Sequence, residues 1–280
     1  MVPFDHKQLA AALYPAVLEA GRVEMQHFTS GSKSSIVIET KADRSPVTAA
    51  DRQAEAIIVA ALASFAPEIP IVAEEAVAAG HIPARADRFF LVDALDGTRL
   101  FIRGKPEFSV NIGLVDKGRP VFGLIYIPPT GDLYVTVGNG AAAKAIAPCG
   151  VTQARSYEAL PFSILKSRTP DRANLKAYNS QSAGGASSEF LTALNVRHAE
   201  PVGSSLKFCL IAAGEGDIYA RFGETSEWDT AAGQAILEAA GGSVTTLDGA
   251  PLTYGKASAT YRNPHFVAWG REPLLPVPEA

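Results

Sequence analysis

The chain has 280 residues, of which 47% are hydrophobic, and it carries a formal net charge of -4 at pH 7. This length suits one large domain or two closely joined ones, and the mildly acidic balance argues against a nucleic-acid polymer as partner. Its two cysteines, Cys149 and Cys209, lie far apart in the sequence, which favours a cytoplasmic protein without disulfides. No run of about 20 apolar residues is present to span a membrane. Peripheral attachment at the inner membrane is the alternative location.

The first half of the chain predicts helices followed by strands. Apolar residues at helical spacing (Leu9, Leu13, Val17 and Ala20) predict a helix over residues 9–28. A loop is expected at residues 30–35, and a second helix at residues 49–65 with Asp51 in its first turn. The expected strands are short apolar or alternating runs bounded by turn residues, at residues 36–39, 69–73, 89–92, 108–115, 120–127 and 133–137. The last three predict an antiparallel meander, which a further hairpin at Asn139-Gly140 would extend.

The pattern changes near residue 150 to an alternation of strands and helices. Strands are expected at residues 162–165, within residues 196–202 and at residues 217–220, and helices at residues 170–178, 206–213 and 230–240. Segregated blocks followed by alternation predict an α+β fold with an α/β second half. We therefore divide the chain into an N-terminal α+β half, residues 1–150, and a C-terminal α/β half, residues 151–280.

The strand expected at residues 89–92 runs directly into two carboxylates, a glycine and a hydroxyl. This stretch reads Asp93-Ala94-Leu95-Asp96-Gly97-Thr98, and Glu74-Glu75 follows the apolar run at residues 69–73. In proteins, Mg²⁺ is commonly bound by one or two carboxylates together with phosphate oxygens of the substrate. Gly97 and Thr98 offer backbone N–H groups for an anion. The pattern indicates metal-assisted phosphate chemistry, or else an ordinary turn after a strand.

A second acidic element lies late in the chain, at Glu227-Trp228-Asp229-Thr230. Asp229 or Thr230 is suited to cap the helix expected at residues 230–240, which Gly241-Gly242 would end. Asp229 therefore has two open interpretations, as a helix cap alone or as a further metal ligand.

Taken together, these motifs resemble those of the inositol monophosphatase family of Mg²⁺-dependent, lithium-sensitive phosphatases. The matching stretches are Val72-Ala73-Glu74-Glu75, Asp93-Ala94-Leu95-Asp96-Gly97-Thr98 and Trp228-Asp229-Thr230-Ala231-Ala232-Gly233. The stretches at residues 97–102, 107–112, 203–209 and 219–223 are most similar to the bacterial 3′(2′),5′-bisphosphate nucleotidase branch. The resemblance covers residues 9–267 and implies a layered α-β-α-β-α sandwich with its site where the halves meet.

The resemblance also implies roles for individual residues. Two or three Mg²⁺ ions would be held. Glu74, Asp93 and the Leu95 carbonyl would bind the first, Asp93, Asp96 and Asp229 would bind the second, and Glu74 would assist through a water on the third. Asp51 and Thr98 match the pair that orients the attacking water, with Glu74 assisting, and Lys41 matches a lysine near the metals. The amides of Gly97 and Thr98 would hold the scissile phosphate, so that the substrate contacts Leu95, Asp96, Gly97, Thr98 and Asp229. Glu75 is not expected to be a ligand, because neighbouring strand residues face opposite ways.

The second phosphate of a bisphosphate nucleotide would be held by Ser204, Ser205 and Lys207, whose hydroxyls and ammonium are suitable donors. The alternative for these residues is a helix cap and a solvated lysine. Arg103, Arg168 and Arg221 are further basic candidates that only the fold could place. The five histidines show no ligand spacing, and no catalytic role is expected for them.

The implied substrate is a small-molecule phosphate ester, adenosine 3′,5′-bisphosphate, converted to AMP in the disposal of a by-product of sulfate activation. Inositol monophosphate and fructose-1,6-bisphosphate are the alternatives within the family, and a binding protein without turnover is the alternative outside it. The one feature that favours a binding protein is Ala94, which stands where the family usually has proline. Without the fixed φ of proline, the metal-binding loop has to be held in place by other contacts. A monomer and a homodimer are both compatible with the resemblance.

Overall fold

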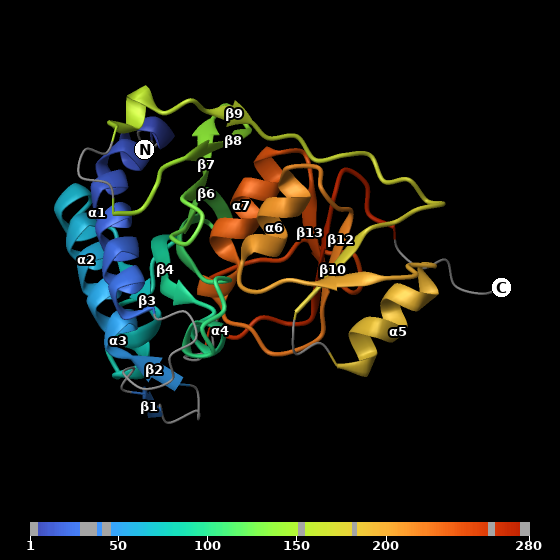
Figure 1. The fold of residues 1–280 in the computed structure, drawn as a ribbon, viewed down its shortest axis with the longest axis horizontal. Helices are drawn as coiled ribbons and strands as arrows, with labels where there is room; N and C mark the ends of the chain where they lie inside the picture. The colour runs from blue at the N-terminus through green and yellow to red at the C-terminus, as the bar shows by residue number, and fades with distance from the viewer. Residues whose placement is uncertain are drawn as a thin grey trace.

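The computed structural model describes residues 5–28, 38–40, 46–150, 155–180, 184–256 and 261–274. Five layers are stacked along its long axis (Figure 1). Helices α1 (His6–His27) and α2 (Ala49–Phe65) form the first layer, a seven-stranded sheet the second, and helices α6 (Leu206–Ala212) and α7 (Ala231–Ala239) the third. A five-stranded sheet and helix α5 (Gly185–Ala193) complete the stack. The predicted α-β-α-β-α sandwich is confirmed.

The seven-stranded sheet contains its strands in chain order. They are β3 (Ile71–Ala73), β4 (Arg88–Asp96), β5 (Ser109–Asp116), β6 (Arg119–Ile127), β7 (Asp132–Gly138), β8 (Ala141–Ile146) and β9 (Ser163–Ile164). Only β3 and β4 pair in parallel; every later neighbour is antiparallel, as expected of a meander. Asn139 and Gly140 have φ values of 53° and 66°, which makes the tight hairpin that their sequence predicts.

The five-stranded sheet has a mixed order, β11-β10-β12-β14-β13. Its strands are β10 (Ala177–Asn179), β11 (Ala199–Pro201), β12 (Ile218–Arg221), β13 (Ser243–Thr246) and β14 (Phe266–Trp269). Strands β10, β11 and β12 run parallel, whereas β14 is antiparallel to both of its neighbours. A separate short pair joins β1 (Ile38–Thr40) to β2 (Pro46–Thr48), just before α2.

Alternation along β4 explains why the sheet is covered on both faces. Phe89 and Leu91 are buried in the core beneath α6 and α7, whereas Phe90 and Val92 are buried against α1 and α2. Successive strand residues point to opposite faces, so an uninterrupted apolar run is what a doubly covered strand requires. The four residues predicted for the buried face of α1 are all fully buried.

Helix α7 lies unusually close to the seven-stranded sheet. A Cβ at Gly113 of β5 would lie 2.8 Å from the Cβ of Ala231, and one at Gly123 of β6 would lie 2.2 Å from the carbonyl oxygen of Ala232. The first turn of α7 therefore rests directly on strand backbone. This seat fixes the position of Asp229, two residues before the helix.

The helix predicted over residues 170–178 is wrong. Asp171 accepts a hydrogen bond from the backbone N–H of Ala173 at 3.0 Å, a local turn that competes with a helix. The N–H of Lys176 is taken by the carboxylate of Asp217 at 2.8 Å, and the following residues pair with two other strands as β10. Long-range pairing has overridden local preference.

Other differences concern ends and omissions. Glu74 and Glu75 begin a short helix, α3 (Glu74–Ala78), so the reason given for separating them, opposite strand faces, does not apply. Helix α5 and strands β13 and β14 were not predicted from the sequence. The expected loop at residues 30–35, the start of the strand expected at residues 36–39, and Lys41 lie outside the described residues. Within the described part of the chain, no helix has the length and apolar character needed to cross a bilayer.

Candidate metal and phosphate site

Carboxylates from three distant segments meet at one end of the seven-stranded sheet. Glu74 begins α3, Asp93 lies on β4, and Asp229 ends a 3₁₀ turn, η2 (Glu227–Asp229). One ligand oxygen from each of the three lies within 4.8 Å of the others. They line a cleft of about 860 Å³, to which Asp96, Gly97 and Thr98 also contribute. The structure thus brings together the predicted ligands, with Asp96 beside the group of three.

The Asp93–Asp96 stretch is a bulged strand rather than a plain turn. Asp93 lies opposite Asn111 and Asp96 lies opposite Ser109, so β4 holds one more residue than β5 over this interval. The Oδ1 of Asp93 accepts a hydrogen bond from the N–H of Leu95 at 3.0 Å. This bond holds the bulge without a proline at position 94, and Ala94 itself is buried.

Gly97 ends the bulge and begins helix α4 (Thr98–Ile102). Its φ of 100° lies in the left-handed region that glycine adopts without cost. A Cβ at this position would also lie 2.8 Å from the carbonyl oxygen of Glu107. The predicted helix start is therefore confirmed, and both Gly97 and Thr98 line the cleft.

Asp51 and Thr98, predicted as a pair, are hydrogen-bonded. The Thr98 hydroxyl donates to Oδ1 of Asp51 at 2.9 Å and lies 3.1 Å from the Leu95 carbonyl oxygen. The other oxygen of Asp51 accepts from the N–H and the hydroxyl of Thr48, at 2.8 and 2.6 Å, in the capping box of α2. Helix capping thus orients the same carboxylate that holds Thr98.

Asp229 does not cap helix α7. Its Oδ2 accepts a hydrogen bond from the N–H of Ser226 at 2.8 Å, and Thr230 occupies the N-cap of α7, although its hydroxyl makes no capping bond to the first turn of that helix. Burial, followed by the charges of Asp96 and Glu74, raises the pKa of the Asp229 carboxyl well above its ordinary value. Buried carboxylates that repel one another are stabilised by a cation, and an all-oxygen set suits a hard divalent ion such as Mg²⁺.

The Asp96 carboxylate is held by two hydrogen bonds, both of which its Oδ2 accepts. The Ser205 hydroxyl lies 2.8 Å from this oxygen and the amide nitrogen of Asn111 lies 3.3 Å from it. Asn111 is fully buried on β5, and the sequence reasoning did not select it. Glu55 was missed as well: its carboxylate accepts the N–H groups of Glu75 and Ala76 at 2.7 and 2.8 Å, which fixes the start of α3 beside Glu74.

The recognition segment, as we call residues 202–207, helps to line the same cleft as the carboxylates. Its Gly203 N–H donates to the Glu107 carboxylate at 2.6 Å, and Ser204 has a φ of 47°. The Lys207 ammonium donates to the carbonyls of Val202 and Ser204 at 3.0 and 2.6 Å, and the residue is only 4% exposed. Burial lowers the pKa of Lys207 to about 8. A solvated lysine, one of the two alternatives, is therefore wrong.

The basic candidates separate into two groups. Arg103 and Arg221 line the cleft, together with Arg99 and Arg262, which the sequence reasoning did not single out. The Arg221 guanidinium is steadied by donating to the Ser180 hydroxyl at 2.6 Å. Arg168 instead forms a two-pronged ion pair with the buried carboxylate of Asp217, which belongs to the structural framework.

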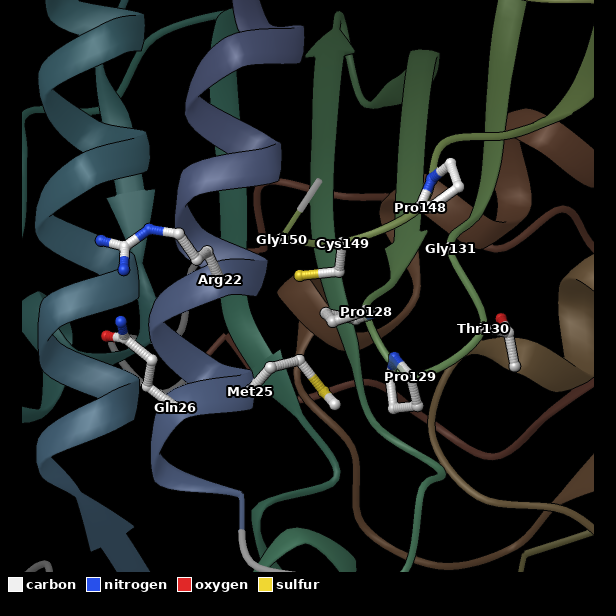
Figure 2. A pocket seen from close by; sticks show the side chains of 10 residues that line it. All are labelled: Arg22, Met25, Gln26, Pro128, Pro129, Thr130, Gly131, Pro148, Cys149 and Gly150. Carbon is white, nitrogen blue, oxygen red and sulfur yellow. The ribbon is translucent and has the colours of Figure 1, made fainter. Parts of the chain in front are cut away.

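A second hollow, of about 400 Å³, lies between α1 and the loops after β6 and β8 (Figure 2). Arg22, Met25 and Gln26 of α1 line one side of it and Cys149 lines the other, and the side chains of Arg22 and Gln26 extend away from Cys149. Arg22 is already bonded to Glu19 in the same helix, and burial raises the pKa of the Cys149 thiol. The hollow therefore lacks both an available cation and an activated nucleophile, and the large cleft is the candidate site.

Comparison with known proteins agrees with this geometry. The sequence profile of the inositol monophosphatase family matches residues 5–272. A 3′(2′),5′-bisphosphate nucleotidase, CysQ of Escherichia coli strain K12, is 39% identical over 248 residues, which are 88% of this chain and 94% of the relative. CysQ of Buchnera aphidicola is 38% identical over 234 residues, 81% of each chain.

Solved structures show the same fold. The crystal structure of CysQ from Bacteroides thetaiotaomicron, described as a bacterial member of the inositol monophosphatase family, has a TM-score of 0.75 and 32% identity, over 96% of this chain and 99% of its own. An inositol monophosphatase from Zymomonas mobilis has a TM-score of 0.70 and 26% identity, over 95% and 92% of the two chains.

Proposed function

This chain belongs to the inositol monophosphatase family, and we propose that it is a Mg²⁺-dependent 3′(2′),5′-bisphosphate nucleotidase that converts adenosine 3′,5′-bisphosphate to AMP. The observation that carries the proposal is the meeting of Glu74, Asp93 and Asp229 beside the Asp51–Thr98 pair in one cleft. The named activity of relatives that align over most of the chain supports the choice of substrate. The reaction would recycle a by-product of sulfate activation in the cytoplasm.

In this proposal the metal ligands are divided as the family motifs imply. Glu74, Asp93 and the Leu95 carbonyl would hold one Mg²⁺, and Asp93, Asp96 and Asp229 would hold the other. The bound metals would supply charge to activate the attacking water and to stabilise the leaving oxygen. Residues 1–150 then contribute all of these ligands except Asp229, and residues 151–280 contribute Asp229 and the recognition segment.

Thr98 is the group that accepts a proton from the attacking water. Its single hydroxyl hydrogen has two acceptors, Asp51 at 2.9 Å and the Leu95 carbonyl at 3.1 Å, so in either case the lone pairs of Oγ1 are left to accept from water. A proton lost by the water can pass to Thr98 as Thr98 passes its own to Asp51. The N–H groups of Gly97 and Thr98, at the start of α4, hold the phosphate oxygens during this transfer.

The second phosphate and the nucleoside occupy the other wall of the cleft. We assign Ser204 and Lys207 to the second phosphate, and Arg221 beside them adds a bidentate donor. Each of these residues lines the cleft within the C-terminal half. Ser205 was predicted for the same role, but its hydroxyl is engaged by Asp96 and by the Asp229 carbonyl, so we leave it out of this set.

Phosphate release from adenosine 3′,5′-bisphosphate, inositol-1-phosphate and fructose-1,6-bisphosphate, measured side by side with Mg²⁺ and with chelator, tests the proposal. We expect the nucleotide to be preferred and all activity to be lost with chelator. A preference for the inositol or sugar phosphate would retain the metal assignment and overturn the substrate. No release from any substrate at millimolar Mg²⁺ would favour a binding protein instead. Lithium is expected to inhibit, and gel filtration would distinguish a monomer from a homodimer.

A further inference from the structure

Ser205 touches two of the proposed metal ligands at once. Its Oγ lies 2.8 Å from Oδ2 of Asp96 and 2.8 Å from the backbone carbonyl oxygen of Asp229. Asp96 comes from β4 and Asp229 from η2, two segments more than a hundred residues apart in the chain. Ser205 belongs to the lining of the cleft but is only 2% exposed, and its hydroxyl is occupied by these protein contacts.

The Ser205 hydroxyl has one donor and two acceptors around it. Asn111 donates to the Ser205 oxygen at 2.8 Å, and its second amide hydrogen points to Oδ2 of Asp96 at 3.3 Å. The Asn111 carbonyl oxygen accepts from the Ser109 hydroxyl at 3.0 Å, which fixes which way the amide is oriented. The single Ser205 hydrogen is therefore shared between Asp96 and the Asp229 carbonyl, with no donor left over for a substrate phosphate.

Helix α6 confirms that this hydroxyl serves another purpose than capping. Ser205 occupies the N-cap of α6, where a serine oxygen ordinarily accepts an N–H from the first turn. Here it makes no such bond, and the neighbouring Ser204 oxygen lies 3.4 Å from the N–H of Leu206 instead. Helix α6 therefore lacks a capping hydrogen bond from Ser205, because the Ser205 hydroxyl is bonded to Asp96.

We propose that Ser205, held by Asn111, is a positioning residue that aims the Asp96 carboxylate and the Asp229 segment at the metal, whereas the adjacent Ser204 faces the substrate. This inference rests on the proposed function only in taking Asp96 and Asp229 as metal ligands. Partners that hydrogen-bond a metal ligand fix its orientation, and their loss typically weakens metal affinity by about 10- to 100-fold. The Ser205 hydroxyl contacts Asp96 at its side-chain carboxylate and Asp229 at its backbone carbonyl, so losing the hydroxyl would release both segments together.

The two adjacent serines provide matched variants. Mn²⁺ binding to the full-length protein without substrate, followed by electron paramagnetic resonance of the free ion, reports the metal site directly. We expect Ser205→Ala to raise the Mn²⁺ dissociation constant by about 10-fold or more, and Ser204→Ala to leave it unchanged. In steady-state assays Ser205→Ala should require more Mg²⁺ for half-maximal activity, with kcat restored at high Mg²⁺, whereas Ser204→Ala should raise the KM for the nucleotide.

A second variant protects the inference from a folding artefact. Asn111→Ala removes the donor that orients Ser205, and we expect it to weaken Mn²⁺ binding in the same direction, with little added effect when it is combined with Ser205→Ala. If the wild type binds Mn²⁺ and Ser205→Ala binds it equally well, the positioning role is overturned while the proposed function stands. If the wild type itself binds no Mn²⁺, the metal assignment is overturned and the inference falls with it.

Discussion

Glu24 is a carboxylic acid enclosed in the protein interior. It lies on α1 and is 0% exposed, and among the described residues neither of its carboxyl oxygens finds a hydrogen-bond partner. Burial, followed by the charge of Asp51, raises the pKa of this carboxyl well above its usual 4.5. Burial of this kind favours the neutral form of Glu24 in the folded protein, at a cost to stability.

Replacing Glu24 with methionine tests this description. Methionine keeps the length of the side chain and removes both unpaired oxygens, which should stabilise the fold by about 1–3 kcal/mol. A further, pH-dependent gain arises because the unfolded chain ionises Glu24 near its usual pKa while the folded chain does not. Since the folded pKa is raised, the wild type loses stability relative to the variant as pH rises, by at most about 1.4 kcal/mol per pH unit, until the folded pKa is passed.

Equilibrium unfolding in urea at several pH values between 4.5 and 8 would measure the two contributions. Glu24→Gln is the matched control, because it keeps the shape and an unpaired polar group but does not titrate. We expect the difference in unfolding free energy between Glu24→Met and Glu24→Gln to stay constant with pH, and the difference of each from the wild type to widen. A wild type that is more stable than Glu24→Met at pH 7, or a difference that does not change with pH, would refute the reasoning.

Three further predictions concern the cleft. Asp96→Asn should abolish phosphate release while circular dichroism stays native, since it removes a charge from the metal site; substantial remaining activity would contradict the two-metal assignment. Lys207→Ala should raise the KM for adenosine 3′,5′-bisphosphate more than that for inositol-1-phosphate, and equal changes would remove the main local support for a nucleotidase. Gly203→Ala would place a Cβ 2.3 Å from Leu100 Cδ1 and 2.7 Å from Glu107 Cβ, and should lower the urea-unfolding free energy by about 1–3 kcal/mol; an unchanged midpoint would contradict the close packing.

Local sequence was sufficient where the structure depends on neighbours in the chain. The β4 run, the Gly97 helix start and the Asn139-Gly140 hairpin are determined by residues a few positions apart, and all three are confirmed. The layered fold and the family were accessible because several such motifs occur together. Their combination restricts the possibilities far more than any one of them does.

Residues that act through distant partners were not accessible in this way. Asn111 reaches Ser205 across 94 positions and Glu107 reaches Gly203 across 96, and no local pattern signals either contact. Ser205 and Ser204 are neighbours of identical type, and only the folded arrangement shows that one is turned inward. The wrong helix over residues 170–178 has the same origin, because pairing with β11 and β12 decided its backbone.

The close seat of α7 on Gly113 and Gly123 has a consequence for the order in which the protein assembles. Asp229 is synthesised 136 residues after Asp93 (229 − 93), which at about 5–20 residues per second is a delay of about 7–27 s. Throughout that interval the nascent seven-stranded sheet lacks both the helix that covers one of its faces and the last carboxylate of the cluster. Docking of α7 supplies the two together, so under the proposed metal assignment the complete set of carboxylate ligands would form only late in folding.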